Sequence, residues 1–177
     1  MIPEIKIKDK KRIIILGCAG SGKSTLSKQL GEALNLNIAH LDKIYYLPNW
    51  KERDHEEFKK MQEEIVQEDK WIIDGNFRDT LDIRLNRCDL IIYLDLNRFV
   101  SLHNAHKRYK MYKDKQRDSL AEGCLDKFDK SFRKWILNFK KNSKPIIMKK
   151  ISEYPEKDIL IFKTRRSLDK YLKNQLN

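Results

Sequence analysis

The sequence contains no long hydrophobic run, and its longest apolar stretches are only as long as a β-strand. A helix that crosses a membrane needs about 20 apolar residues in succession, so no segment qualifies. No N-terminal apolar segment resembles a secretion signal either. We therefore expect a cytoplasmic protein with a globular fold, which its 40% content of hydrophobic residues allows.

Cysteine is also scarce, with three residues placed far apart at Cys18, Cys88 and Cys124. No Cys-x-x-Cys or Cys/His metal-site spacing is present, and the four histidines show no metal-ligand spacing. The pattern argues against a disulfide framework and against a zinc site. It favours free thiols in a reducing compartment.

The sequence shows no internal repeat and no low-complexity linker, and five short apolar segments alternate with helical patterns. The predicted strands are 12–16, 37–41, 71–74, 90–94 and 159–162. The predicted helices are 23–34, 54–69, 80–87, 98–112, 125–139, one starting at Pro145 and one capped by Ser167, with loops at 43–51 and 113–123. This alternation predicts an α/β fold with a parallel sheet flanked by helices. We expect one domain over 1–177, with a short helical lid inserted at about 105–135.

Three of the six glycines fall within residues 17–22, directly after the first predicted strand. Together with Lys23 and Ser24 they match the P-loop pattern G-x-x-x-x-G-K-[ST]. Glycines let the backbone turn tightly, so that its N–H groups converge on a phosphate at the start of the next helix. Lys23 can then reach the β- and γ-phosphates, and the Ser24 hydroxyl can hold Mg²⁺. The expected nucleotide-binding residues are Gly17, Cys18, Ala19, Gly20, Ser21, Gly22, Lys23, Ser24 and Thr25.

Aspartates end three of the predicted strands, at the edge where parallel sheets bind ligands. Asp74 suits the second Mg²⁺ partner of P-loop chemistry, and Arg78 just beyond it can grip a phosphate or carboxylate of the substrate. Asp42 can accept a hydrogen bond from a substrate hydroxyl or position Mg²⁺ through water, although it can equally be a turn residue. Asp95 has the same placement, but ordinary helix capping follows it at Asn97.

The formal net charge of +12 is unevenly distributed. Residues 97–150 carry 16 Lys and Arg against 5 Asp and Glu, whereas residues 1–96 carry 16 against 17. Such a field attracts nucleotide phosphates, nucleic acid or an anionic surface, although a solvated helical face gives the same pattern. Positive groups around a transferred phosphoryl group and exclusion of water are what phosphoryl transfer requires. The candidate catalytic residues are Lys23, Arg108, Arg117 and Arg133.

These motifs together resemble the nucleoside-monophosphate kinase branch of P-loop proteins. Residues 17–25 resemble its phosphate loop, and 72–78 resemble its apolar-Asp-Gly-x-Pro-Arg element, with Phe77 in place of the proline. Arg108, Arg117 and Arg133 resemble the lid arginines of that family. Lys163, Thr164 and Arg165 lie where the family encloses the adenine, so the resemblance adds them to the nucleotide-binding residues.

Over nearly its whole length the chain also resembles the adenylate-kinase-related group labelled DNA topology modulation protein. The matching stretches are 41–42, 47–50, 71–77, 92–95, 117–118, 122–124 and 135–136. The resemblance implies the strand order 2-3-1-4-5, ATP and Mg²⁺ as cofactors, Lys23 and Ser24 at the phosphates, Asp74 at the metal and Arg78 toward the acceptor.

Two functions remain open at this point. The first is an ATP-binding, Mg²⁺-dependent phosphotransferase, similar to adenylate kinase, that moves the γ-phosphate to a small acceptor such as a nucleotide. The alternative is a nucleic-acid-associated ATPase or regulator that affects DNA topology. The positive charge of residues 97–150 supports this alternative. No helix-turn-helix or zinc module is visible, and the arginines have a simpler role at ATP, so the sequence favours the kinase.

Overall fold

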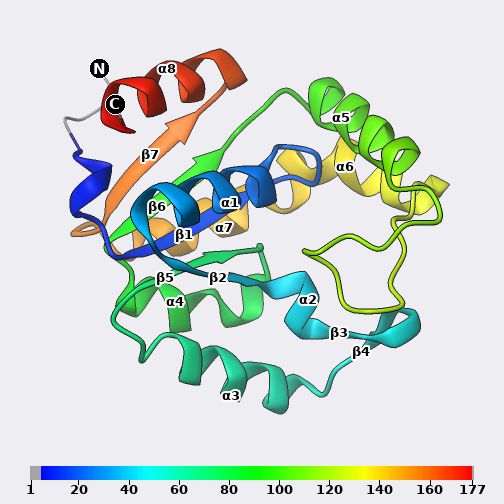
Figure 1. The fold of residues 1–177 in the computed structure, drawn as a ribbon, viewed down its shortest axis with the longest axis horizontal. Helices are drawn as coiled ribbons and strands as arrows, with labels where there is room; N and C mark the ends of the chain where they lie inside the picture. The colour runs from blue at the N-terminus through cyan, green and yellow to red at the C-terminus, as the bar shows by residue number, and fades with distance from the viewer. Residues whose placement is uncertain (1–4, 177) are drawn as a thin grey trace.

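The computed structural model describes residues 5–176, and a five-stranded parallel sheet forms its centre (Figure 1). The strands lie in the order β2-β5-β1-β6-β7, and all four neighbouring pairs are parallel. Their bounds are β1 Arg12–Gly17, β2 Asn37–His40, β5 Trp71–Asp74, β6 Leu90–Leu94 and β7 Asp158–Phe162. Numbered along the chain among themselves, the five strands have the expected order 2-3-1-4-5. Their labels skip numbers because a separate two-stranded hairpin, β3–β4, lies between β2 and β5.

The central strand β1 explains why the sheet is covered on both faces. Ile13, Ile14, Ile15 and Leu16 are all fully buried, as expected for a parallel strand with helices on either side. Because successive side chains point to opposite faces, Ile14 and Leu16 enter one core cluster while Ile13 and Ile15 enter another. Burying each such side chain stabilises the fold by about 1.5–3 kcal/mol.

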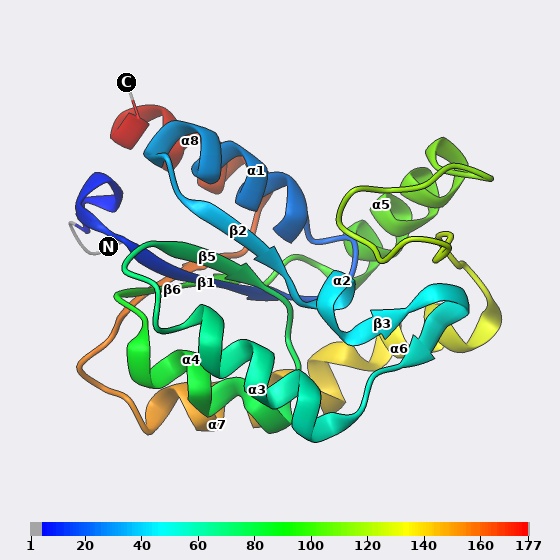
Figure 2. The same cartoon turned by 60° about the horizontal axis from the view of Figure 1, so that its bottom comes forward.

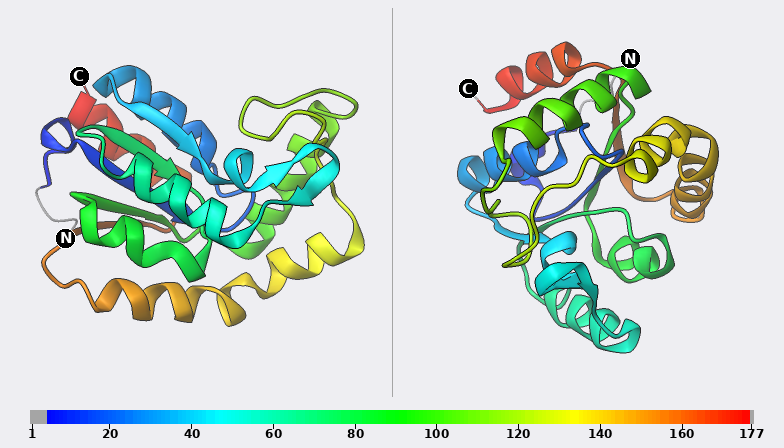
Figure 3. Two further views of the ribbon diagram at one scale, coloured as in Figure 1. Left: turned by 90° about the horizontal axis from the view of Figure 1, so that it is seen from below. Right: turned by 90° about the vertical axis from the view of Figure 1, so that its right-hand side faces the viewer.

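The helices divide between these two faces, as Figure 2 shows. Helices α1 and α8 cover one face through Leu26, Leu30, Leu168 and Leu172, while α3, α4, α6 and α7 contribute to the core on the other. In Figure 3, α6 and α7 run one after the other along that second face. The helices are α1 Lys23–Leu34, α2 Leu41–Tyr45, α3 His55–Ile65, α4 Leu81–Arg87, α5 Arg98–Met111, α6 Lys130–Asn142, α7 Lys144–Ser152 and α8 Arg165–Leu176. Short 3₁₀ turns are η1 Ile7–Asp9, η2 Pro48–Trp50 and η3 Arg78–Thr80.

Two segments around the sheet edge differ from the prediction. The second strand ends at His40, so Asp42 lies in the short helix α2 and not at a strand end. The predicted loop 43–51 instead contains a small antiparallel hairpin, β3 Tyr46–Leu47 and β4 Lys51–Glu52. Both elements are too short to show a periodicity in sequence, which is why the pattern did not reveal them.

Two helix starts also differ, and in each case a capping side chain is the reason. Helix α6 begins at Lys130, because the carboxylate of Asp129 accepts a hydrogen bond from the backbone N–H of Phe132 (2.8 Å). Helix α8 begins at Arg165, because Thr164 Oγ1 accepts from the backbone N–H of Ser167 (3.1 Å). Ser167 therefore lies inside the first turn, and the prediction that it caps this helix is wrong.

The predicted lid at about 105–135 consists of the second half of α5, a long connection and the first turn of α6. The connection packs onto the β3–β4 hairpin, since Leu120, Ala121 and Cys124 form a small buried cluster against Tyr46 and Trp50. Lys28 on α1 forms a further tie, with its Nζ 2.6 Å from Asp118 Oδ2. The lid thus bridges the phosphate loop's helix and the hairpin. That 1–177 is one domain stays a prediction.

Within residues 5–176, no helix has the length and apolar character needed to cross a membrane.

Candidate active site

Two pockets open at the carboxyl ends of the sheet strands, one on either side of Lys23. The loop pocket, of about 450 Å³, is lined by Gly20, Ser21, Gly22, Lys23, Ser24, Thr25, Lys28, Leu96, Asn104, Lys107, Arg108, Met111, Tyr112, Arg117, Ser119 and Arg165. The aromatic pocket, of about 660 Å³, is lined by Ala19, Lys23, Ser24, Asp42, Tyr46, Trp50, Asp74, Gly75, Asn76, Phe77, Arg108, Arg117, Leu120, Asp126, Lys127, Asp129, Ser131, Phe132 and Trp135. Four residues line both: Lys23, Ser24, Arg108 and Arg117.

The phosphate loop between β1 and α1 depends on glycine for close packing as well as for its turn. A Cβ on Gly20 would lie 2.0 Å from the carbonyl oxygen of Ser101, so α5 can approach the loop only if this residue is glycine. Asn104, also on α5, donates to the carbonyl of Gly20 (3.1 Å). On the other side, Asn76 donates to the Gly17 carbonyl (2.9 Å) and accepts from its N–H (3.1 Å). The loop is therefore held from two sides before any ligand binds.

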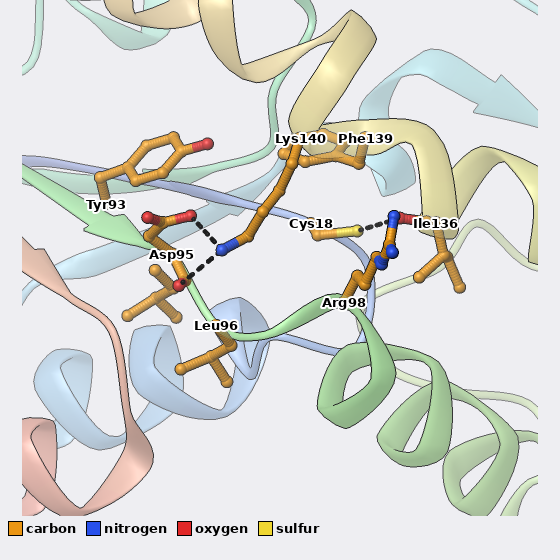
Figure 4. A pocket seen from close by; sticks show the side chains of 9 residues that line it. Cys18, Tyr93, Asp95, Leu96, Arg98, Ile136, Phe139 and Lys140 are labelled. Atoms are coloured by element: carbon orange, nitrogen blue, oxygen red, sulfur yellow. Dashed lines mark hydrogen bonds and ion pairs between the residues drawn. The ribbon is translucent and has the colours of Figure 1, made fainter.

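Of the predicted loop residues, Gly20 to Thr25 line the loop pocket, while Ala19, Lys23 and Ser24 reach the aromatic pocket. Cys18 faces away from both. Its thiol lies 3.8 Å from the carbonyl of Ile136 in a cavity of about 10 Å³ beneath the loop (Figure 4), and burial raises its pKa to about 11. A raised pKa disfavours the thiolate, so Cys18 is not an activated nucleophile.

Lys23 stands at the junction of the two pockets. Its Nζ donates to the loop carbonyls of Gly17 (3.0 Å) and Cys18 (3.1 Å). Desolvation lowers the pKa of Lys23, and the negative charges of Asp74 and Asp42 act in the opposite direction.

Asp74 is 4% exposed and is fixed by two neighbours. Its Oδ2 accepts from Ser27 Oγ (2.8 Å) on α1 and lies 2.9 Å from His40 Nδ1. The strand register explains the second contact, because His40 and Asp74 are paired residues of β2 and β5. Among the described residues nothing hydrogen-bonds Oδ1 of Asp74. Sequence reasoning missed His40, although its place at the end of the strand next to Asp74 was the available signal.

Asp42 lines the aromatic pocket from α2, on the same side as Asp74. The protein atoms around its carboxyl raise the pKa of Asp42 by desolvation, while Lys23 lowers it. The residue nonetheless stays in contact with water across the open pocket. Helix α2 thus brings to the site a carboxylate that the sequence had assigned to a strand end.

Two of the three lid arginines converge on one acid that sequence reasoning did not single out. Asp126 Oδ1 lies 3.3 Å from Arg108 and Oδ2 lies 3.6 Å from Arg117, and the Asp126 side chain is 4% exposed. Burial lowers the pKa of Arg117, as does the nearby Arg108, whereas Asp126 raises it. The Nε atoms of both arginines are buried without a hydrogen-bond partner among the described residues. Both side chains therefore keep unused donor capacity.

Arg133 and Arg78 are not brought into this constellation, contrary to expectation. Arg133 is exposed on the first turn of α6, where its Nε donates to the Asp129 carbonyl (3.4 Å). Arg78 points toward the end of α6 and donates to the carbonyl of Asn142 (3.5 Å). Neither lines either pocket. At this turn the pocket is lined by Phe77, so Arg78, the next residue, is directed away from it.

The turn after β5 is held by a buried arginine that sequence reasoning missed. Arg84 on α4 is 0% exposed and donates to the carbonyls of Gly75 (2.7 Å), Asn76 (2.9 Å) and Phe77 (3.0 Å). Desolvation lowers the pKa of Arg84 to about 9. Its three hydrogen bonds support a backbone in which Phe77 has a φ of +27°.

Of the three residues expected at the adenine, only Arg165 lines the loop pocket. Its guanidinium would lie 3.6 Å from a Cβ on Gly22, and its Nε pairs with Asp169 (2.8 Å). Thr164 caps α8, and Lys163 is exposed.

Part of the basic segment pairs with acids at the end of β6 and on α4. Asp95 is 7% exposed and lies 3.0 Å from Lys140 and 2.7 Å from Lys144, the first of which is drawn in Figure 4. Lys150 pairs in the same way with Asp82. Asp95 therefore anchors α6 and α7 to β6. Although Asp95 and Asp42 were both predicted at strand ends beside the site, Asp95 lines neither the loop pocket nor the aromatic pocket.

The residues present fit a hydrated Mg²⁺ better than a tightly enclosed metal. No cluster of three or more His, Cys, Asp or Glu that could hold a metal occurs within residues 5–176. Mg²⁺ commonly binds through one or two protein oxygens, several waters and substrate phosphates. Ser24 and the unpaired Oδ1 of Asp74 line the same pocket and supply such oxygens.

No protein-family model matches the chain. Among solved structures, the fold is similar to shikimate kinase from Acinetobacter baumannii in complex with shikimate, with a TM-score of 0.57 at 16% identity over 94% of this chain and 96% of that one. It is also similar to shikimate kinase from Bacteroides thetaiotaomicron (TM-score 0.54, 20% identity, 93% and 96%). A sugar kinase from Janibacter sp. HTCC2649 follows at a TM-score of 0.50 and 12% identity, over 92% of each chain. At these identities the likeness establishes the fold alone, an α/β fold similar to that of these kinases.

One sequence relative is closer. The uncharacterized protein YqaC of Bacillus subtilis strain 168 is 30% identical over 129 residues, which is 71% of each chain. This homology spans most of both proteins, and the chain belongs to the family of B. subtilis YqaC.

Proposed function

We propose that this protein is an ATP-dependent, Mg²⁺-dependent phosphotransferase that moves the γ-phosphoryl group of ATP to a hydroxyl of a small acceptor. One observation carries the proposal: two separate pockets meet at Lys23, Ser24, Arg108 and Arg117. The loop pocket holds the donor and the aromatic pocket holds the acceptor. Transfer takes place where the two join, between three cationic side chains.

The loop pocket suits a nucleoside triphosphate. The backbone N–H groups of residues 20–25 and the N-terminus of α1 surround the β- and γ-phosphates. Lys23 leaves the loop carbonyls for the phosphates, while Arg165 borders the outer end of the pocket, near the nucleoside.

Ser24 and Asp74 hold Mg²⁺, which when bound neutralises charge on the phosphates and orients them. Ser27 and His40 keep the Asp74 carboxylate directed into the pocket. Such neighbours of a metal ligand fix its orientation and raise its affinity.

Asp42 accepts the proton of the acceptor hydroxyl. As the bond between that oxygen and the γ-phosphorus forms, the bond from the γ-phosphorus to the β–γ bridging oxygen breaks, and ADP retains the electron pair. Lys23, Arg108 and Arg117 stabilise the negative charge on the equatorial oxygens. The phosphoryl group draws the two arginines from Asp126, whose contacts with them, at 3.3 and 3.6 Å, are loose.

The experiment is transfer from [γ-³²P]ATP to a panel of nucleosides, nucleoside monophosphates and polyols that includes shikimate, with and without Mg²⁺. We expect labelled product from at least one acceptor, loss of product on chelation of Mg²⁺, and loss in Lys23→Ala. Tight binding of ATP with no transfer to any acceptor would argue against the proposal. The nucleic-acid alternative is not proposed, since no contact among the described residues favours it and Arg108 and Arg117 border the phosphate site.

A further inference from the structure

The part of the aromatic pocket that is not shared with the loop pocket is dominated by rings. Five aromatic side chains line it, from four separate segments: Tyr46, Trp50, Phe77, Phe132 and Trp135. Phe77 follows β5, and Phe132 and Trp135 lie on α6. Aromatic side chains gathered at a pocket wall offer flat apolar surface to a flat ligand.

These rings are packed so that some of their surface stays open. Phe132 and Trp135 are nearly parallel, at 7° with centroids 5.9 Å apart. Trp50 stands edge-on to Tyr46, with centroids 4.9 Å apart. Trp135 is 42% exposed, whereas the core tryptophan Trp71 is 1% exposed. An indole left this open at a pocket wall is available for stacking.

The charges of this unshared part disfavour an anionic acceptor. No arginine lines it, and its single cation, Lys127, lies over the Trp50 ring with Nζ 4.9 Å from the centroid. Arg78, the residue expected to grip an acceptor phosphate, points to the end of α6. The loop pocket by contrast is lined by Lys23, Lys28, Lys107, Arg108, Arg117 and Arg165.

Most of the acids in this part are already engaged. Asp74 is hydrogen-bonded by Ser27 and His40, Asp126 is paired with the two arginines, and Asp129 caps α6. Asp42 alone is left to receive a hydroxyl. The unshared part therefore combines open ring surface, one available carboxylate and no arginine.

We infer that the acceptor is a nucleoside, an uncharged flat base carrying sugar hydroxyls, and not a nucleoside monophosphate. The base stacks among the rings while a sugar hydroxyl meets Asp42, which takes its proton as the oxygen bonds to the γ-phosphorus of ATP. The products are a nucleoside monophosphate and ADP. This inference rests on the proposed phosphotransferase for its chemistry, and on the rings and charges of the pocket for its substrate class.

Equilibrium dialysis tests it directly. Radiolabelled adenosine, guanosine, cytidine, uridine and thymidine, and the 5′-monophosphate of each, are measured with the loop pocket saturated by Mg²⁺ and a non-hydrolysable ATP analogue. We expect at least one nucleoside to bind about tenfold or more tightly than its own monophosphate. Tighter binding of the monophosphates, or no nucleoside binding at all, would overturn the inference.

Variants at Trp135 test whether the nucleoside binds at the rings of the aromatic pocket. This side chain makes no hydrogen bond among the described residues, so Trp135→Ala is expected to leave the fold intact and to weaken nucleoside binding about tenfold through lost stacking. Trp135→Phe should retain most of the affinity, and Phe99→Ala, an exposed aromatic of α5 outside both pockets, should change nothing. Unchanged nucleoside binding in Trp135→Ala would also overturn the inference.

The same samples separate this inference from the proposed function. Nucleosides that bind and are phosphorylated from ATP support both. Nucleosides that bind in the expected way, with no transfer from ATP to any acceptor of the panel, overturn the phosphotransferase and leave the ring-binding site standing. Transfer from ATP to monophosphates or to shikimate, but not to nucleosides, overturns the nucleoside inference and leaves the phosphotransferase standing.

Discussion

The loop pocket and the aromatic pocket are built in different ways. The inner wall of the loop pocket comes from one continuous stretch, residues 20–25, and much of its binding capacity is main-chain N–H. The aromatic pocket draws its lining from α2, the β3–β4 hairpin, the turn after β5, the lid connection and α6. Binding a triphosphate requires a particular backbone path, which few sequences allow. Binding an acceptor requires side chains, which many sequences can supply from many places.

The two pockets also differ in how well their residues tolerate substitution. Gly20 cannot take even a Cβ without meeting α5, so the loop tolerates almost no change. The lid cluster of Leu120, Ala121 and Cys124 packs against Tyr46 and Trp50 largely by apolar contact, which other residues of similar volume can satisfy, although the backbone N–H of Trp50 also donates to Cys124 Sγ (3.3 Å). We therefore expect the donor side to fail sharply on mutation, and the acceptor side to change its preference by degrees.

We expect the largest loss of activity from a substitution at Lys23. Lys23→Ala removes a cation that serves both ATP binding and transfer, so we expect kcat/KM to fall about 10⁴-fold. Steady-state kinetics with the best acceptor measures it. Lys60→Ala on the exposed side of α3 is the matched control and should retain full activity. A loss below tenfold for Lys23→Ala would mean that the loop does not act as the donor site.

Arg117 tests the junction itself, because it lines both pockets. We expect Arg117→Ala to lower kcat about 10³-fold with a smaller effect on the KM for ATP, since its charge is needed mainly in the transition state. The comparison variant is Arg133→Ala, an arginine of the same predicted set whose side chain is exposed beyond both pockets. Equal losses in the two variants would contradict the placement of the lid arginines described above.

Asp42 tests the acceptor side. We expect Asp42→Asn to lower kcat about 10²-fold, because the acceptor hydroxyl loses its proton acceptor. Desolvation raises the pKa of Asp42 above its ordinary value, and only the deprotonated form can take a proton. Activity of the unmodified protein should therefore fall as the pH drops through that raised pKa, at a higher pH than a free aspartate would give. A pH profile of kcat/KM that keeps this acidic limb in Asp42→Asn would assign it to another group.

The smallest effect is expected at His40, which acts through Asp74 as a positioning residue. His40→Ala leaves the Asp74 carboxylate with Ser27 alone, so the Mg²⁺ concentration for half-maximal activity should rise about tenfold. The KM for the acceptor should stay unchanged, because His40 lines neither pocket. Mg²⁺ titration of activity measures the first quantity, and a matching rise in acceptor KM would show instead that the whole strand end had moved.

Sequence reasoning reached most of the fold, because most of the strands are short apolar runs and the loop motif fixes where the first of them ends. It failed where a capping side chain outweighed the apolar periodicity and where an element is too short to show a pattern. The start of α6 was set by the capping carboxylate of Asp129 and not by the apolar periodicity from Leu125. The β3–β4 hairpin has two residues in each strand, too few for any pattern.

The site residues differ in the same way, since local geometry places some of them and distant neighbours place the others. Lys23, Ser24 and Asp74 line the pockets where the sequence placed them, because a motif or a strand end positions them by local geometry. Arg78 and Arg133 were misplaced because the direction of a long side chain depends on its neighbours in space. His40, Arg84 and Asp126 were missed because their partners lie 34, 7 to 9, and 9 to 18 residues away in sequence, with no motif linking them.

The sequence by itself therefore determined the phosphate loop and the alternation of strands and helices, since each depends on residue type at fixed short spacing, whereas the order of the sheet followed from the family resemblance. Only the tertiary structure decided which carboxylates and arginines share a pocket, and that the part of the aromatic pocket not shared with the loop pocket is lined by rings and lacks an arginine. The physical reason is that backbone conformation follows from local sterics and hydrogen bonding, whereas a pocket of side chains exists only once distant segments have packed together.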